Sequence, residues 1–299
     1  MEYIKDLLDK LGELSPIETN VQPDFKKDPN IKAVIFDIYG TLLISASGDI
    51  EQSELNEQNL MQALESSNIK ITCDCHDALK HILEDFEYTI KLCHKTAQEN
   101  QVPYPEIDIL SIWQIVLIHA RKKGLIDFND DTVDTLRMTC VFEFLSNKIY
   151  PMPGMHEVIS ELKSRKYPLG IISNAQFYTP VVMNYYLSEK FGLSEEIDHF
   201  DKELTVFSYK LGIGKPDTKL FEELVPTLKK KYNLQPNQVA FVGNDMLKDI
   251  YTSNEVGFKT ILFAGDKRSL RMREGDQRIN GLKPDYIITD LKQILEILA

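Results

Sequence analysis

Hydrophobic positions follow two different patterns in two parts of the chain. Short, nearly continuous apolar runs alternate with amphipathic helical stretches from residue 150 onward, and one further apolar run begins at residue 31. The runs are IKAVI, PLGIIS, VAFVG, KTILF and DYII. Runs of this length, bounded by turn residues, are typical of strands buried on both faces. Strands that alternate with helices predict a mostly parallel sheet, because parallel neighbours need crossover connections.

Between these two regions the pattern is helical, with almost no strand signal. The predicted helices span 51–67, 75–101, 105–123 and 130–149. The third is apolar on nearly all sides, which indicates a helix in the middle of a bundle, and its Trp113 is expected to lie in the core. This block predicts an all-α bundle that interrupts the α/β sheet domain.

The predicted domain organisation therefore has three parts. Residues 1–30 hold a helix over 2–14 and a proline-containing linker, 31–45 and 150–299 form the α/β core, and 46–149 form the helical domain. Pro226 lies within a helix predicted over 217–232, so that helix should be kinked or restarted there.

Composition restricts the partners and the compartment. The 299 residues include 46 acidic and 34 basic side chains, and the formal charge of -12 disfavours both nucleic acid and an anionic membrane surface. No apolar stretch approaches the roughly 20 residues of a membrane span, and the N-terminus lacks the layout of a secretion signal. A cytoplasmic protein is expected, with monomer and homodimer both left open.

The cysteines favour reduced thiols over a disulfide framework or a zinc site. The four of them are dispersed. Cys73 and Cys75, followed by His76, have a spacing tighter than zinc sites usually show, and no second paired cluster exists.

Polar residues follow several of the predicted strands, at the edge where parallel sheets bind ligands. A carboxylate there can act as a nucleophile, while hydroxyl, amide and ammonium groups can stabilise a phosphoryl group. A second carboxylate opposite the first calls for a cation, and Mg²⁺ prefers such oxygen ligands. The residues are Asp37 and Thr41 after the first strand, Ser173 and Asn174 after the second, Lys215 in GIGKPD, and Asp245 and Asp249 in VGNDMLKD.

In these motifs, in PMPG at 151–154 and in the PDYIITDL ending, the chain resembles the haloacid dehalogenase (HAD) superfamily of aspartate-nucleophile phosphatases and dehalogenases. The resemblance covers 31–45 and 150–299 and implies a Rossmann-like core, with 46–149 at the position of that superfamily's first type of helical cap. It implies a small phosphorylated substrate. The implied roles are Asp37 as nucleophile, Ser173 and Lys215 as phosphate ligands, and Asp37, the Tyr39 carbonyl, Asp245 and Asp249 around Mg²⁺.

Tyr39 departs from the phosphatase pattern, which has a second aspartate there to protonate the leaving group. A phenol, with a pKa near 10, is poorly matched to that task at neutral pH. Either the leaving group needs no proton, as with acyl or aryl phosphates, or the proton comes from elsewhere, such as the cap.

The form D-x-Y-G-T-L is also that of 2-haloacid dehalogenases, which attack carbon without a metal. Other positions differ from those enzymes: Lys248 stands where they have an aspartate, and Phe221 where they have a tyrosine. The leading hypothesis is a Mg²⁺-dependent phosphatase, with a dehalogenase or a catalytically impaired binding protein as alternatives. Cationic residues at 266–273 could receive a second anionic group, although surface charge is the simpler interpretation.

Overall fold

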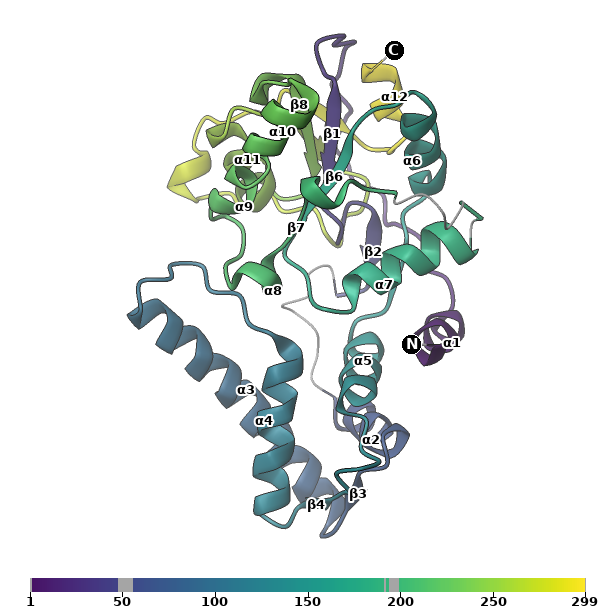
Figure 1. Ribbon diagram of the computed structural model, residues 1–299, viewed down its shortest axis with the longest axis vertical. Helices are drawn as coiled ribbons and strands as arrows, with labels where there is room; N and C mark the ends of the chain where they lie inside the picture. The colour runs from purple at the N-terminus through teal and green to yellow at the C-terminus, as the bar shows by residue number, and fades with distance from the viewer. Residues whose placement is uncertain (1, 48–55, 191, 194–198, 299) are drawn as a thin grey trace.

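A six-stranded parallel sheet forms the centre of the molecule in the computed structural model, which describes residues 2–47, 56–190, 192–193 and 199–298. The strand order is β10-β9-β8-β1-β6-β7, and every neighbouring pair is parallel, which confirms the predicted α/β class (Figure 1). The strands are β1 (Ala33–Phe36), β6 (Leu169–Ser173), β7 (Thr205–Phe207), β8 (Val239–Gly243), β9 (Lys259–Phe263) and β10 (Tyr286–Ile288).

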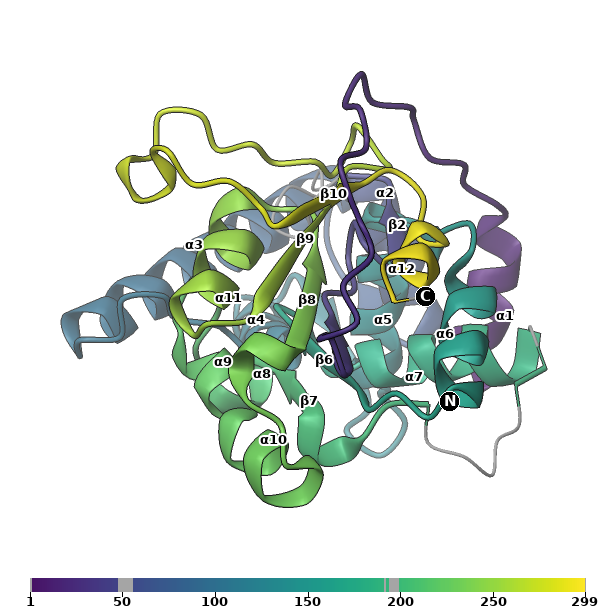
Figure 2. The same cartoon turned by 90° about the horizontal axis from the view of Figure 1, so that it is seen from above.

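Helices cover both faces of this sheet, as Figure 2 shows from above. Alternate residues of β1 enter different hydrophobic cores: Val34 and Phe36 join one, and Ile35 joins the other. The first core includes α6 (Met155–Ser164) and α12 (Gln293–Ile297), and the second includes α9 (Lys219–Glu222) and α10 (Val225–Tyr232). Burial on both faces explains why the strand segments are apolar at consecutive positions.

The chain reverses its direction of growth across the sheet at β1. It passes from β1 to β6 and β7 on one side, then returns to β8, which pairs with the other side of β1. Such a switch point opens a crevice at the carboxyl ends of the strands. The residues that follow β1, β6 and β8 therefore meet at one place.

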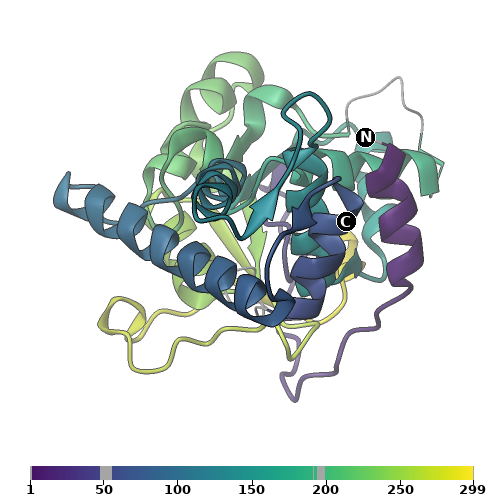
Figure 3. The ribbon, with the colours of Figure 1, turned by 90° about the horizontal axis from the view of Figure 1, so that it is seen from below.

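The helical block lies below the sheet in Figure 1, and the long helix α3 crosses beneath the core in Figure 3. Trp113 is fully buried there and stacks on Phe86 with ring centroids 4.2 Å apart, which confirms its predicted core position. The block is not entirely helical, because β3 (Lys70–Ile71) and β4 (Ile126–Asp127) pair antiparallel. Its helices are α2 (Glu57–Ser66), α3 (Cys75–Glu99), α4 (Ile109–Lys122) and α5 (Thr135–Ser146).

The predicted bounds differ from the observed ones where local signals act. The helices α2 to α5 each begin after an Asn or Asp whose side chain accepts a backbone N–H, and the predicted start at 51 lies outside the described residues. The prediction of a break at Pro226 is confirmed, because α9 ends at Glu222 and α10 restarts with Pro226 in its first turn.

The two ends of the helical block are tied together beside the sheet. The antiparallel pair β2 (Leu43–Ser45) and β5 (Ile149–Pro151) joins the chain that enters the block to the chain that leaves it. α1 (Glu2–Leu11) ends three residues before the predicted bound and packs on α5, with Ile4 and Leu8 buried. The remaining helices are α7 (Thr179–Asn184), α8 (Ser208–Leu211) and α11 (Thr252–Glu255). Within the described residues, no helix is long and apolar enough to cross a membrane.

Candidate active site

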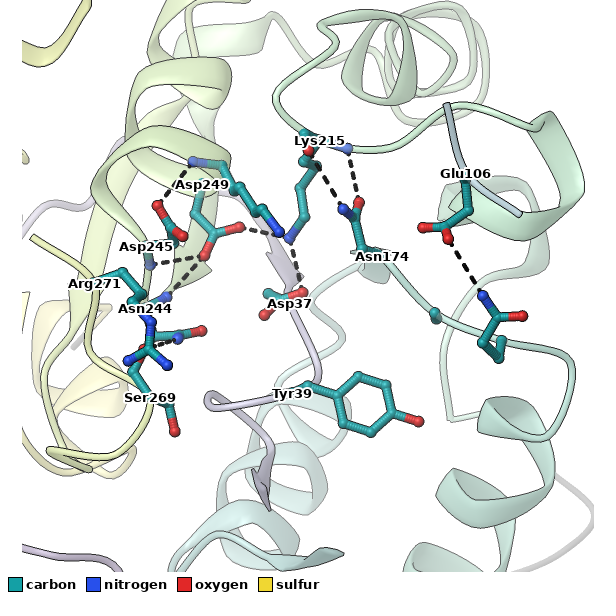
Figure 4. Close-up of a pocket in the computed structure, with 13 residues that line it drawn as sticks. Asp37, Tyr39, Glu106, Asn174, Lys215, Asn244, Asp245, Asp249, Ser269 and Arg271 are labelled. Carbon is teal, nitrogen blue, oxygen red and sulfur yellow. Dashed lines mark hydrogen bonds and ion pairs between the residues drawn. The ribbon is translucent and has the colours of Figure 1, made fainter. Parts of the chain in front are cut away.

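Asp37 is the first residue after β1 and lies at the bottom of a pocket at the carboxyl edge of the sheet. Its backbone N–H donates to the Val242 carbonyl at 2.9 Å, which extends the pairing of β1 with β8. Only 6% of the residue is exposed. Its carboxylate points toward Lys215 rather than toward Tyr39 (Figure 4).

Lys215 links two carboxylates in this pocket. Its Nζ donates to Asp37 Oδ1 at 2.8 Å and to Asp249 Oδ1 at 2.5 Å, and the phenyl ring of Phe241 lies 5.5 Å away. Burial lowers the pKa of Lys215, but the charges of Asp249 and Asp37 outweigh it, so the pKa is raised above its usual value. The ammonium group is therefore held charged between two acids.

Asp249 and Asp245 are positioned by the turn of π-helix at Met246–Tyr251 that follows β8. Asp249 Oδ2 accepts the backbone N–H groups of Asn244 and Asp245 at 2.9 and 3.0 Å. Asp245 caps the turn, accepting from the N–H groups of Leu247 and Lys248. Burial raises the pKa of Asp249 to about 7, because the charge of Lys215 opposes this only in part and the charges of Asp37 and Asp245 add to it. Negative charge is thus concentrated in a space with little water.

Arg273 pairs with Asp245 from the loop that follows β9. Its Nη2 lies 2.5 Å from Asp245 Oδ2, and its Nε lies 3.0 Å from the same oxygen. Arg271, two residues earlier, accepts the Met246 N–H at its carbonyl and lines the pocket. The cationic loop at 266–273 is therefore part of the site, which the surface interpretation of its charges did not anticipate.

Gly40 and Asn244 fix the chain on the other side of Asp37. Gly40 has a φ of +84°, and a Cβ there would lie 2.5 Å from the Cβ of Ser269, so a side chain is excluded. Asn244 donates to the Ser269 carbonyl and accepts the Thr41 hydroxyl at 3.1 Å. Thr41 is fully buried and is not among the residues that line the pocket.

Asn174 and Ser173 differ in what they face. Asn174 lines the pocket and holds the Lys215 backbone from both sides, accepting its N–H at 2.7 Å and donating to its carbonyl at 3.3 Å. The Ser173 hydroxyl donates to the Asn174 carbonyl at 3.3 Å, and Ser173 does not line the pocket. Of the predicted phosphate-binding residues, Asn174 and Lys215 reach the pocket surface.

Tyr39 directs its phenol away from the nucleophile. Its hydroxyl shares a hydrogen bond of 2.8 Å with Thr179 Oγ1 at the start of α7, and the ring extends away from Asp37 in Figure 4. Burial raises its pKa above the usual value of a phenol. The hydroxyl is thus unsuited to proton transfer at neutral pH.

The residues predicted to bind magnesium fit the ion by their chemistry. Asp37, Asp245 and Asp249 supply carboxylate oxygens, and three carboxylates face the two cations Lys215 and Arg273, which leaves net negative charge for a divalent ion. Within the described part of the chain, however, no group of three or more His, Cys, Asp or Glu side chains is already arranged around one metal position, at this pocket or at Cys73 and Cys75. A metal would have to compete with Lys215 and Arg273 for these oxygens.

Two adjacent cavities lie at the sheet edge beside Asp37. The inner one, of about 70 Å³, is lined by Asp37, Asp249 and Lys215. The outer one, of about 560 Å³, lies between the sheet edge and the helices α3 and α5, and it shares Asn174 and Lys215 with the inner one. Glu106 and Gln176 line both cavities and are hydrogen-bonded to each other at 3.3 Å. Neither was predicted, because both lie in loops without a recognisable motif.

Known proteins resemble this chain in sequence and in fold. Over 147 residues the chain is 30% identical to the glyceraldehyde 3-phosphate phosphatase of Pyrococcus furiosus, and over 148 residues it is 28% identical to that of Methanothermobacter thermautotrophicus. These matches cover 49% and 50% of this chain, and it spans about half the length of these relatives, 54% and 58%. The crystal structure of a 2-haloacid dehalogenase from Pseudomonas syringae has the same fold, with a TM-score of 0.55, 21% identity, and coverage of 90% of this chain and 98% of that one.

The family model for haloacid dehalogenase-like hydrolases matches residues 31–257, which span β1, the helical block and the strands as far as β8. The matched segment holds the residues gathered around Asp37, including Lys215 and Asp249. This chain belongs to the haloacid dehalogenase-like hydrolase family.

Proposed function

We propose that the protein is a Mg²⁺-dependent phosphatase that acts on a small phosphorylated compound through an aspartyl-phosphate intermediate. The observation that carries the proposal is the buried cluster in which Lys215 Nζ contacts both Asp37 and Asp249, beside Asp245. Asp245 is a third carboxylate beside Asp37 and Asp249, and without a bound cation it would repel the carboxylate of a haloacid substrate. The cluster therefore suits a phosphatase that binds a metal better than a dehalogenase.

In the proposed reaction an oxygen of Asp37 attacks phosphorus, and the bond from phosphorus to the leaving oxygen breaks with its electrons on that oxygen. Lys215 stabilises the charge on the transferred group, and water then hydrolyses the aspartyl phosphate. Asp37, the Tyr39 carbonyl, Asp245 and Asp249 would hold Mg²⁺, which supplies charge neutralisation at the phosphoryl oxygens.

The buried phenol of Tyr39 affects the choice of leaving group. Since its hydroxyl is bonded to Thr179, we infer that the enzyme favours phosphates whose leaving oxygen departs without a proton, such as acyl and aryl phosphates. The rate should therefore fall steeply as the pKa of the leaving group rises across a series of phosphate monoesters. A flat dependence, with simple alkyl phosphates turned over well, contradicts this inference.

The nucleophile is tested with Asp37→Asn, which should reduce turnover about a thousandfold or more because an amide is a poor nucleophile. Capture of ³²P-labelled protein during turnover by wild type, and not by Asp37→Asn, tests the intermediate directly. Turnover by Asp37→Asn at the wild-type rate would refute the proposal.

A dehalogenase is the second candidate, favoured by the Tyr39 form of the first motif. Release of chloride from 2-chloropropionate in the presence of EDTA would establish it. A third outcome, Mg²⁺ binding without turnover of any phosphate or haloacid, would indicate a binding protein on an enzyme fold.

A further inference from the structure

The outer cavity has an apolar wall made by the helical block. Phe86 and Ile90 of α3, Ile107 before α4, and Phe142 of α5 contribute to it. Phe142 contacts the Trp113 ring edge to face, with centroids 4.8 Å apart, and Trp113 stacks on Phe86. The wall is therefore backed by three interlocked aromatic rings, which makes it a preformed surface rather than a flexible one.

The opposite end of the same cavity is polar and belongs to the proposed phosphate site. Lys215 and Asn174 line both cavities there, so the apolar wall lies in a cavity that adjoins the nucleophile's pocket. A volume of about 560 Å³ lies within the roughly 300–1,000 Å³ of pockets that enclose drug-sized molecules. This space is far larger than a three-carbon phosphate needs.

The charges around the cavity disfavour a second anion on the ligand. Two carboxyl groups, Glu106 and Glu143, line it together with His94 and three lysines. Lys215 and Lys248 also line the inner cavity and therefore lie at the phosphate end, and Lys91 is paired with Glu87 at 3.1 Å. Away from the phosphate end, an additional carboxylate or phosphate on the ligand would lose its hydration beside these carboxyl groups without gaining an unpaired lysine. An uncharged body meets no such penalty.

We propose, on the basis of the phosphatase function proposed above, that the substrate is a phosphate monoester whose leaving group is an uncharged aromatic alcohol lodged against the Phe86, Ile90 and Phe142 wall. An aromatic alcohol combines the apolar shape that this wall fits with a leaving oxygen that departs without a proton donor, as the orientation of Tyr39 requires. The cavity and Tyr39 are independent observations that point to the same class of compound.

The first experiment measures binding without chemistry. Calorimetric titration with 2-naphthol, which carries no phosphate, should show binding at one site, and quenching of Trp113, the single tryptophan, should follow the same curve. 2-Naphthoate, of similar shape but negatively charged, should bind at least tenfold more weakly. No binding of 2-naphthol, or equal binding of both compounds, overturns the proposal.

The second experiment tests whether the wall selects substrates. Ile90→Asn places an amide on the wall, and Ile118→Asn makes the same change on α4 at a side chain that is 49% exposed and outside the cavity lining. For 2-naphthyl phosphate, kcat/KM should fall about five- to tenfold in Ile90→Asn, because part of one apolar contact is lost, and should be unchanged in Ile118→Asn. If the enzyme turns over glyceraldehyde 3-phosphate, both variants should change kcat/KM for that substrate little and to the same extent.

The outcomes separate the two proposals. If 2-naphthol binds and neither phosphate esters nor acyl phosphates are hydrolysed, the phosphatase function is wrong while the aromatic site stands. If acyl phosphates are hydrolysed and aryl phosphates are not, the phosphatase function stands and the inference about the leaving group is overturned. If aryl phosphates are hydrolysed but Ile90→Asn lowers kcat/KM for the naphthyl and the three-carbon substrates alike, the wall does not select the leaving group and the inference is overturned.

Discussion

Glu143 provides a quantitative test of how dry the space between α5 and the sheet edge is. The side chain lines the outer cavity, and its Oε2 accepts a hydrogen bond of 3.5 Å from the Tyr178 hydroxyl. Burial raises the pKa of Glu143 to about 7, and the hydrogen bond from Tyr178 only partly opposes this. Replacing Glu143 with Gln keeps the shape and a hydrogen-bond acceptor but removes the ionisable group.

The sign of the effect follows from the direction of the shift. The folded state binds this proton more tightly than the unfolded chain, whose pKa is near 4.5, so the stabilisation is complete below about pH 4.5 and is lost as the pH rises through 7. A rise of the Glu143 pKa from about 4.5 to about 7 amounts to about 3 kcal/mol, most of which falls between pH 5 and pH 8. In Glu143→Gln this loss of stability with rising pH should be absent.

The assay is urea unfolding at pH 5, 6, 7 and 8, followed by circular dichroism and by Trp113 fluorescence. The free energy of unfolding of Glu143→Gln minus that of wild type should increase by about 2 to 3 kcal/mol from pH 5 to pH 8. Glu84→Gln, at an exposed position on α3, removes one negative charge as a matched control and should give a difference that changes by less than about 0.5 kcal/mol. If the free energy of unfolding of Glu143→Gln minus that of wild type changes as little from pH 5 to pH 8 as it does for Glu84→Gln, Glu143 does not lie in a desolvated site.

Three further changes test the pocket itself. Lys215→Met should lower the free energy of unfolding by about 3 kcal/mol or more at pH 8, and by less at pH 5, because it leaves Asp37 and Asp249 buried without their shared cation; chemical denaturation at both pH values checks this. Gly40→Ala should destabilise the protein by about 2 kcal/mol and reduce turnover, because its Cβ would collide with Ser269, and thermal melting together with kcat measures the two effects. EDTA should abolish phosphatase activity and added Mg²⁺ should restore it, whereas activity that persists in EDTA would exclude the proposed role of the metal.

The sequence was sufficient to predict the sheet and several of the residues at its edge. Strands buried on both faces require continuous apolar runs, and an acidic residue follows each of two runs closely: Asp37 directly after β1, and Asp245 two residues after the end of β8. Lys215 could be predicted because it lies in the motif GIGKPD, which is recognisable from the local sequence alone. The short strands were not predicted, because the three residues of β7 and the two residues of β3 are too few to show a periodic hydrophobic pattern.

The orientations of the side chains could not be predicted, because they depend on partners far away in the chain. Arg273 pairs with Asp245 across 28 positions, and Thr41 donates to Asn244 across 203. The local sequence does not determine whether a hydroxyl near a strand end points into the pocket or into the surrounding core. The Thr41 hydroxyl points into the core, where it donates to Asn244. Such choices are made by hydrogen-bond partners that only the folded chain brings together.

The two sides of the pocket place different demands on a substrate. On the side of Asp37, an ammonium group and several backbone N–H groups compensate buried negative charge. On the side of Tyr39, the hydroxyl is occupied by Thr179, and the neighbouring cavity is walled by apolar side chains. In the proposed reaction the protein would stabilise charge on the phosphoryl oxygens, whereas charge that develops on the leaving oxygen would have to be stabilised by the leaving group itself. An aromatic ring does this by delocalising the charge. With a tyrosine at position 39 in place of an acid, such a site has no proton donor there. It should therefore turn over only compounds whose leaving group is stable as an anion.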